Sequence, residues 1–401
     1  MTQSAVLPAA DRLPLRLDDG EVTYRLVRAW PRSPQHMLLE WERCQGGSPA
    51  ETVVGQWFAD PAALATAVQE APPPARRLGP VLLQPDGVDP RLPALAEVLT
   101  EPGAQLIGHR PGRRAVVRVP GPEGDVFVKV VRRPRRAEDV VRRGQLAHRL
   151  VGGRVVVPAL VGADIQRGVV RWDDVGGRTL SELGTSWAPS EAYQAWRDAG
   201  QAVGVLHAAD PAQVEDRHDD PAEIAGADRW LGPAVAHGRL DPDTVARARQ
   251  QVVTALADLP GEPALGVLHR DLHDRQVLLR PDGRIGLIDV DTLAVGERAV
   301  DLANVLVHLD LRQAQGQLTV EAARAAWAGM RAGLGEVAAV AGEQEVLARA
   351  WRRLPAYVLS CRLRMAAIYS FRPQWHDLAT ALVDAVADGA GKDEDPGVGL
   401  V

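Results

Sequence analysis

Lysine is almost absent from this 401-residue chain: only Lys129 and Lys392 are lysines, and the rest of its 46 basic residues are arginines. Cysteine is equally scarce. Cys44 and Cys361 lie far apart and match no metal-ligand spacing, so we expect buried free thiols rather than a disulfide or a zinc site. No apolar run reaches the length of a membrane span, and the first residues lack the basic and apolar regions of a signal peptide. We therefore expect a cytoplasmic protein without a membrane partner.

The remaining composition, 46% hydrophobic and 24% charged, is that of an ordinary globular protein of two or three domains. A net charge of −6 provides no general basic field for nucleic acid, so we expect no nucleic-acid partner. The local basic cluster from Arg132 to Arg136 has no interleaved aromatic residues, which favours a solvated loop over a nucleic-acid site. Such a loop could still lie over a bound anion.

The most informative segment runs from His269 to Leu279, with the sequence HRDLHDRQVLL. Phosphoryl transfer requires a carboxylate beside the acceptor hydroxyl, and oxygen ligands that hold Mg²⁺ against the nucleotide phosphates. Asp271 is the candidate for the catalytic carboxylate. Gln276 and Asp289, five and eighteen residues further along, have the spacing of the metal ligands in kinases.

Two apolar runs between Gln276 and Ile288 flank a Pro-Asp-Gly turn, which predicts a β-hairpin. The hairpin would bring Gln276 and Asp289 to one end. Asp291 would lie on the same face as Asp289 if the strand continues, where it would assist the metal or contact the acceptor. A turn-forming role for Asp291 is the alternative.

Lys129 stands within Asp125-Val-Phe-Val-Lys129-Val-Val, a short β-branched run that predicts a buried strand, where an unpaired ammonium would be costly. Kinases use a lysine in this setting to hold the α- and β-phosphates. A helix over residues 136–150 follows, where kinases place a glutamate that pairs with this lysine. Either Glu138 takes that role or Lys129 has a different partner.

Before this strand, a turn joins two further predicted strands and contains Gly112, Arg113 and Arg114. It occupies the place of the phosphate-covering loop in kinases, so these three residues are candidates for nucleotide contact. The pattern GxGxxG is missing, and ordinary turn chemistry explains the glycine equally well.

The catalytic segment, together with Gly296-Glu-Arg-Ala-Val-Asp301-Leu-Ala, resembles the aminoglycoside phosphotransferase family. The family normally has asparagine at Gln276 and a small residue at Arg270. Gln276 keeps the amide oxygen that Mg²⁺ accepts and adds one methylene. This glutamine and the long N-terminal extension are more similar to the maltokinase-like branch.

The resemblance implies ATP and Mg²⁺ as cofactors and a small-molecule acceptor that offers a hydroxyl group, such as a sugar, an amino sugar or an aminoglycoside. It also implies that His269 and Asp301 give structural support to the catalytic loop. The rival interpretation is a catalytically impaired protein of the same fold that binds nucleotide or acts as a scaffold. Gln276 and the missing helix glutamate motivate it. The sequence does not indicate an oligomeric state.

We predict an α+β protein with a bilobal protein-kinase-like fold and an additional small β-rich domain at the N-terminus. The expected units are a β-rich cap (1–98), a kinase-like N-lobe (99–173), a helical C-lobe with the catalytic loop (174–387) and a flexible tail (388–401). Apolar periodicity predicts C-lobe helices over residues 301–311, 320–334, 344–369 and 376–387.

Overall fold

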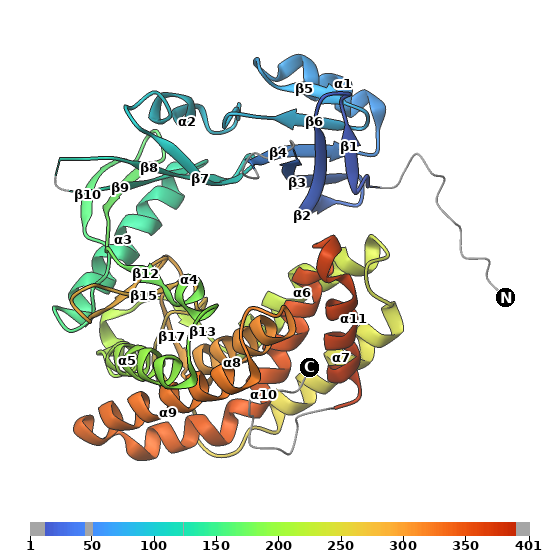
Figure 1. Cartoon of the computed structure of the whole chain (residues 1–401). Helices are drawn as coiled ribbons and strands as arrows, with labels where there is room; N and C mark the ends of the chain where they lie inside the picture. Colours follow the sequence, from blue (N-terminus) through green and yellow to red (C-terminus); the bar gives the residue numbers. More distant parts are fainter. Residues whose placement is uncertain (1–12, 45–50, 123, 390–401) are drawn as a thin grey trace.

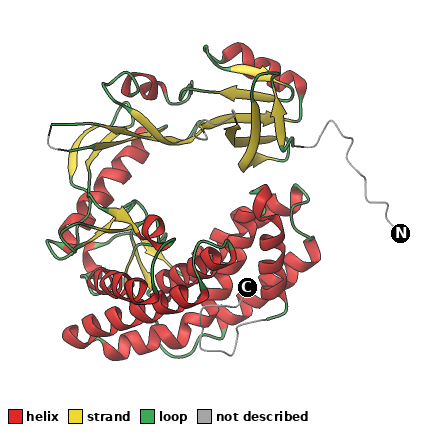
Figure 2. Cartoon of the chain, in the orientation of Figure 1, coloured by secondary structure: helices red, strands yellow, loops and turns green. Residues whose placement is uncertain are grey.

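The computed structural model describes residues 13–44, 51–122 and 124–389. Two strand-rich units lie side by side, and a helical unit lies beneath them (Figure 1). Figure 2 shows that strands dominate the first two units and helices the third, so the predicted α+β class is confirmed. In the described part of the chain, no helix is long and apolar enough to cross a bilayer. The predicted flexible tail lies almost entirely outside the described residues.

The cap is a six-stranded antiparallel sheet with the order β1-β2-β3-β4-β6-β5. Its central strand buries Leu39 and Trp41 completely. The proline-rich segment after residue 70 joins α1 to β5 and is therefore a loop inside the cap. The elements are β1 (Arg16–Asp18), β2 (Thr23–Ser33), β3 (His36–Cys44), β4 (Glu51–Phe58), α1 (Pro61–Glu70), β5 (Arg76–Leu78) and β6 (Val81–Gln84).

The N-lobe is a five-stranded antiparallel sheet with the order β10-β11-β9-β8-β7. Leu95 of α2 packs into a core with Val117 and Val128 of this sheet, so α2 contacts the N-lobe although it falls within the predicted cap. The elements are α2 (Pro93–Val98), β7 (Gln105–Arg110), β8 (Arg114–Val119), β9 (Val126–Val131), α3 (Pro134–Val151), β10 (Leu160–Asp164) and β11 (Val169–Asp173).

The C-lobe contains the four predicted helices as α8, α9, α10 and α11, together with α4, α5, α6 and α7. Two small sheets, β12-β15-β16 and β13-β17-β14, carry the catalytic segment. The elements are β12 (Arg178–Thr179), α4 (Leu180–Gly184), α5 (Pro189–His207), η2 (Pro211–Gln213), β13 (Arg217–His218), α6 (Asp220–Ala236), α7 (Pro242–Ala257), β14 (Leu265–Leu268), β15 (Val277–Leu279), β16 (Ile285–Leu287), β17 (Ala294–Glu297), α8 (Ala299–Ala314), α9 (Val320–Ala341), α10 (Gln344–Tyr369), η3 (Pro373–Trp375) and α11 (His376–Ala387).

Two local predictions differ from the structure. Cys361 is buried, but Cys44 ends strand β3 and is exposed, so the expectation of two buried thiols is wrong for Cys44. The hairpin is present as β15 and β16, but β16 ends at Leu287, and Asp289 has a φ of 59°. Because this backbone conformation interrupts an extended strand, the strand does not continue to Asp291.

The cap contacts the other two units. The amide of Ala29 in β2 donates to the carbonyl of Phe371 in the C-lobe at 2.9 Å. The guanidinium of Arg110 in the N-lobe lies 5.6 Å from the ring of Trp30 in the cap and 6.0 Å from the ring of Trp230 in α6. The cap therefore contacts both the N-lobe, which lies beside it, and the C-lobe, which lies beneath it (Figure 1).

Candidate active site

Buried hydrogen bonds from the C-lobe helices hold the catalytic loop. Asp301 at the start of α8 accepts the backbone N–H groups of His269 at 2.8 Å and Arg270 at 2.7 Å, and its Oδ2 lies 3.1 Å from the ring of His207. Burial acts to raise the pKa of Asp301, but His207 and His269 outweigh it and hold the pKa below its usual range. The carboxylate therefore stays charged and fixes two successive amides.

His269 lies inside this network with no exposed surface. Its ring contacts the carbonyl of Ile288 at 2.9 Å, and the hydroxyl of Thr292 donates to the backbone carbonyl of His269 at 2.7 Å. Asn304, which the sequence reasoning missed, donates to the carbonyl of Arg270 at 2.9 Å. These bonds stabilise Arg270 at a φ of 71°, a conformation that non-glycine residues rarely adopt. Asp271 follows directly and is exposed.

The end of the hairpin brings Gln276 and Asp289 together. The side-chain nitrogen of Gln276 lies 3.5 Å from Oδ2 of Asp289, and a half-turn of the amide would present its oxygen instead. Oxygen donors of this kind are those that Mg²⁺ accepts. In the described residues, no group of three His, Cys, Asp or Glu side chains forms a metal site.

Lys129 on β9 crosses from the N-lobe to these carboxylates. Its ammonium donates to Asp289 at 2.9 Å and to the two oxygens of Asp291 at 2.8 and 2.7 Å. Burial acts to lower the pKa of Lys129, but the two carboxylates outweigh it and raise the pKa above its ordinary value. Glu138, the predicted alternative partner, is exposed on α3. The partners of the lysine are therefore carboxylates of the C-lobe.

Arg143 on α3, which the sequence reasoning also missed, lies near the position expected for the helix glutamate. It donates to the carbonyl of Asp291 at 2.6 Å and forms a two-bond pair with Asp216, both at 3.0 Å. Gly144 follows it, and a Cβ there would overlap the ring of Trp172. The helix therefore presents an arginine where the kinase pattern has an acid.

The β7–β8 turn is fixed by an acid from the preceding segment. Asp89 accepts the amide of Gly112 at 2.5 Å and contacts the ring of His109 at 2.9 Å. The amide of Arg113 donates to the carbonyl of Arg110 at 3.0 Å. These amides are already bonded within the turn. An anion could therefore bind to the turn through the side chains of Arg113 and Arg114.

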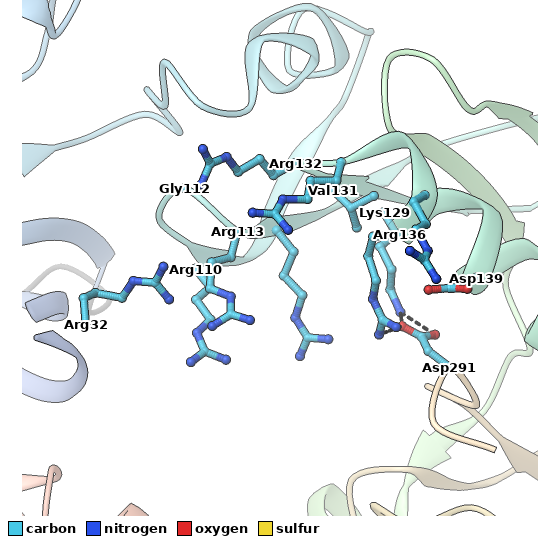
Figure 3. A pocket seen from close by; sticks show the side chains of 13 residues that line it. Arg32, Arg110, Gly112, Arg113, Lys129, Val131, Arg132, Arg136, Asp139 and Asp291 are labelled. Atoms are coloured by element: carbon cyan, nitrogen blue, oxygen red, sulfur yellow. Dashed lines mark hydrogen bonds and ion pairs between the residues drawn. The ribbon is translucent and has the colours of Figure 1, made fainter. Parts of the chain in front are cut away.

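These groups border a cavity of about 560 Å³, shown in Figure 3 and named here the arginine cavity. The N-lobe turn, the start of α3 and the cap contribute to it. Its lining residues are Arg32, Arg110, Gly112, Arg113, Arg114, Lys129, Val131, Arg132, Arg133, Arg135, Arg136, Asp139 and Asp291. The sequence cluster from Arg132 to Arg136 therefore lies over a concave site.

Comparison with solved structures identifies the fold. A thermostable mutant of aminoglycoside phosphotransferase APH(4)-Ia, in a ternary complex with AMP-PNP and hygromycin B, is 16% identical with a TM-score of 0.50, covering 74% of this chain and 98% of that one. A type VIII aminoglycoside-3'-phosphotransferase is 23% identical with a TM-score of 0.45, covering 67% and 99%. The predicted kinase-like fold is confirmed.

The macrolide 2'-phosphotransferase MphH from Brachybacterium faecium is a further similar structure, 21% identical with a TM-score of 0.41, covering 67% of this chain and 92% of that one. No curated protein matches the chain. The sequence profile described as "Phosphotransferase enzyme family" matches residues 106–339, which is more than half of the chain and excludes the cap. The chain therefore belongs to the phosphotransferase enzyme family.

Proposed function

We propose that the protein transfers the γ-phosphoryl group of ATP to a hydroxyl of a small-molecule acceptor, with Asp271 as the carboxylate that orients this hydroxyl and accepts its proton. Asp271 is exposed, which leaves it accessible to an acceptor. The buried bonds to His269 and Arg270 fix the backbone beside it. A carboxylate positioned in this way contributes about 10²- to 10⁴-fold to the rate.

A single observation carries the proposal: Lys129 of one lobe reaches Asp289 and Asp291 of the other, beside Gln276 and the loop that bears Asp271. In this proposal Lys129 binds nucleotide phosphates together with the side chains of the β7–β8 turn. Asp289 and Gln276 would hold Mg²⁺, which offsets the charge of the transferring group when bound. Asp291 would then keep the ammonium of Lys129 in place.

Family membership supports ATP as the donor, and one similar protein was crystallised with AMP-PNP. Gln276 and the six-stranded cap support a place in the maltokinase-like branch, which favours a sugar acceptor. A cytoplasmic location fits the use of ATP and stays a prediction. The alternative function, nucleotide binding without turnover, is favoured by the two carboxylates that engage Lys129 and by the exposed position of Glu138.

The test is MgATP consumption by the purified protein with a panel of sugars, amino sugars, sugar phosphates and aminoglycosides. We expect Asp271→Ala to reduce acceptor-dependent turnover by about 10²-fold or more while MgATP still raises the melting temperature. Asp228→Ala is the matched control, because Asp228 is an exposed carboxylate paired with Arg249 at 2.8 Å on the lobe surface. It should leave both readouts unchanged.

Two outcomes would contradict parts of the proposal. Thermal stabilisation by MgATP without turnover for any acceptor would favour the binding-protein alternative. Turnover that persists in Asp271→Ala would remove the role assigned to Asp271.

A further inference from the structure

The arginine cavity is strongly cationic. Among the residues that the structure describes, nine cationic side chains line it against two carboxylates, Asp139 and Asp291, which is a surplus of seven positive charges. The chain as a whole has a net charge of −6, so this concentration is local. Figure 3 shows Arg32 and Arg110 at one end of the cavity and Lys129, which is bonded to Asp291, at the other end.

Most of these arginines are not neutralised by the protein. Within the described residues, Arg136 is the only arginine of the lining that forms an ion pair, at 3.6 Å from Asp291. Burial, and then the charges of Arg113, Arg28, Arg114 and Arg32, lower the pKa of Arg110 to about 9. Its Nε is buried without a hydrogen-bond partner. Cations that repel one another in a cavity are stabilised when an anion binds between them.

A nucleoside triphosphate with one Mg²⁺ carries a net charge of only about −2. It would leave most of the surplus in the lining uncompensated. Arg32 and Arg28 belong to the cap, which lies outside the matched residues 106–339. The cap therefore adds positive charge to the part of the site that the family profile does not cover.

We propose that the acceptor is itself anionic, a small molecule that bears a phosphate or similar oxyanion in addition to the hydroxyl, and that its anionic group binds in the arginine cavity. This inference rests on the proposed function. Guanidinium groups bind phosphate oxygens through two parallel hydrogen bonds, and the cavity volume of about 560 Å³ suits a ligand of this size.

The location argues against a macromolecular polyanion. Arg32 enters from the cap, Arg113 from the β7–β8 turn and Arg132 from the loop before α3, so the cations converge on a concave space between three segments (Figure 3). Nucleic-acid sites that track a backbone combine such charge with aromatic side chains for stacking. No aromatic side chain from the described part of the chain lines this cavity.

Calorimetric titration on the full chain, saturated beforehand with MgAMP-PNP, tests the proposal. The probes are fructose 1,6-bisphosphate, fructose and inorganic phosphate. We expect the bisphosphate to bind the nucleotide-saturated protein, fructose not to bind, and phosphate to bind at least about tenfold more weakly than the bisphosphate, because it offers one anionic group instead of two.

The variant Arg32→Gln/Arg132→Gln removes two exposed arginines of the lining. It should weaken bisphosphate binding by about tenfold or more. The matched control is Arg25→Gln/Arg118→Gln, which removes the same charge from exposed arginines of the cap and N-lobe that pair with Glu42 and Asp125. It should leave the affinity unchanged.

Three results would overturn the proposal: no bisphosphate binding, competition between the bisphosphate and MgAMP-PNP, or equal affinity for phosphate and bisphosphate. Competition would mean that the cavity serves the nucleotide alone, and equal affinity would mean a free-anion site. Failure of the proposed function is distinguishable, because it appears as lost MgAMP-PNP binding or missing turnover with every acceptor.

Discussion

At the scale of single residues, Lys129 shows why one lysine persists at the site of an arginine-rich chain. An ammonium offers three donors from a single atom, and three oxygens lie between 2.7 and 2.9 Å from it. A planar guanidinium directs its donors as a fork and would require a wider space between Asp289 and Asp291. The geometry of two carboxylates around one small cation therefore explains why position 129 is lysine and not arginine.

The change Lys129→Met tests this arrangement. It would leave the buried Asp291 and the half-buried Asp289 without their cation, so we expect a loss of about 3–5 kcal/mol in the free energy of unfolding. The double variant Lys129→Met/Asp291→Asn should lose less than the sum of the two single variants, because it removes one of the stranded charges. Urea unfolding of the four proteins measures the coupling, and strict additivity would contradict it.

At the scale of elements, helix α9 approaches α5 closely at glycines. A Cβ at Gly333 would overlap the carbonyl oxygen of Arg197, and one at Gly329 would overlap that of Tyr193. The same pair of helices is joined by Arg197 and Glu336 at 2.7 Å. Because α5 ends at His207, which contacts Asp301, this close crossing positions a partner of the carboxylate that binds the amides of His269 and Arg270.

Gly333→Ala should therefore destabilise the protein by about 1–3 kcal/mol, since the added methyl must push two backbones apart. Gly335→Ala is the matched control two residues further along α9, where a Cβ would meet nothing within 4 Å. It should stabilise by up to about 1 kcal/mol, because alanine is the better helix former. Thermal or urea unfolding measures both changes. A Gly333→Ala protein that is as stable as the Gly335→Ala protein, or more stable, would argue against the close crossing.

The elements that local pattern determines could be predicted from the sequence, and the contacts between distant segments could not. Helix α10 follows from apolar periodicity over 26 residues, and the β15–β16 hairpin from its turn residues. The pairing of Lys129 with Asp291 joins residues 162 positions apart, which no local pattern specifies. The positive φ of Asp289, 59°, has no local sequence signal either, because it does not occur at a glycine.

At the scale of the whole molecule, the cap contacts both lobes on the side away from the connection between β11 and β12 (Figure 1). Trp30 is 5% exposed, and the guanidinium groups of Arg28 and Arg110 lie 4.7 and 5.6 Å from its ring. Next to it, the amide of Ala29 donates to Phe371 of the C-lobe. One tryptophan thus packs where all three units meet, beside the arginine cavity.

We expect Trp30→Ala to loosen this junction more than the interior of any one unit. Loss of the ring removes the contacts of Arg28 and Arg110 and opens a cavity, which should lower the free energy of unfolding by about 3–5 kcal/mol. Amide hydrogen exchange at Ala29 should then accelerate by at least about tenfold, because its bond to Phe371 depends on docking of the cap. Trp30→Phe keeps an aromatic ring for the two arginines, so its amide exchange rate at Ala29 should stay close to that of the wild type. An unchanged exchange rate at Ala29 in Trp30→Ala would show that the cap stays docked on the C-lobe without the tryptophan. The contacts between the three units would then not depend on this side chain.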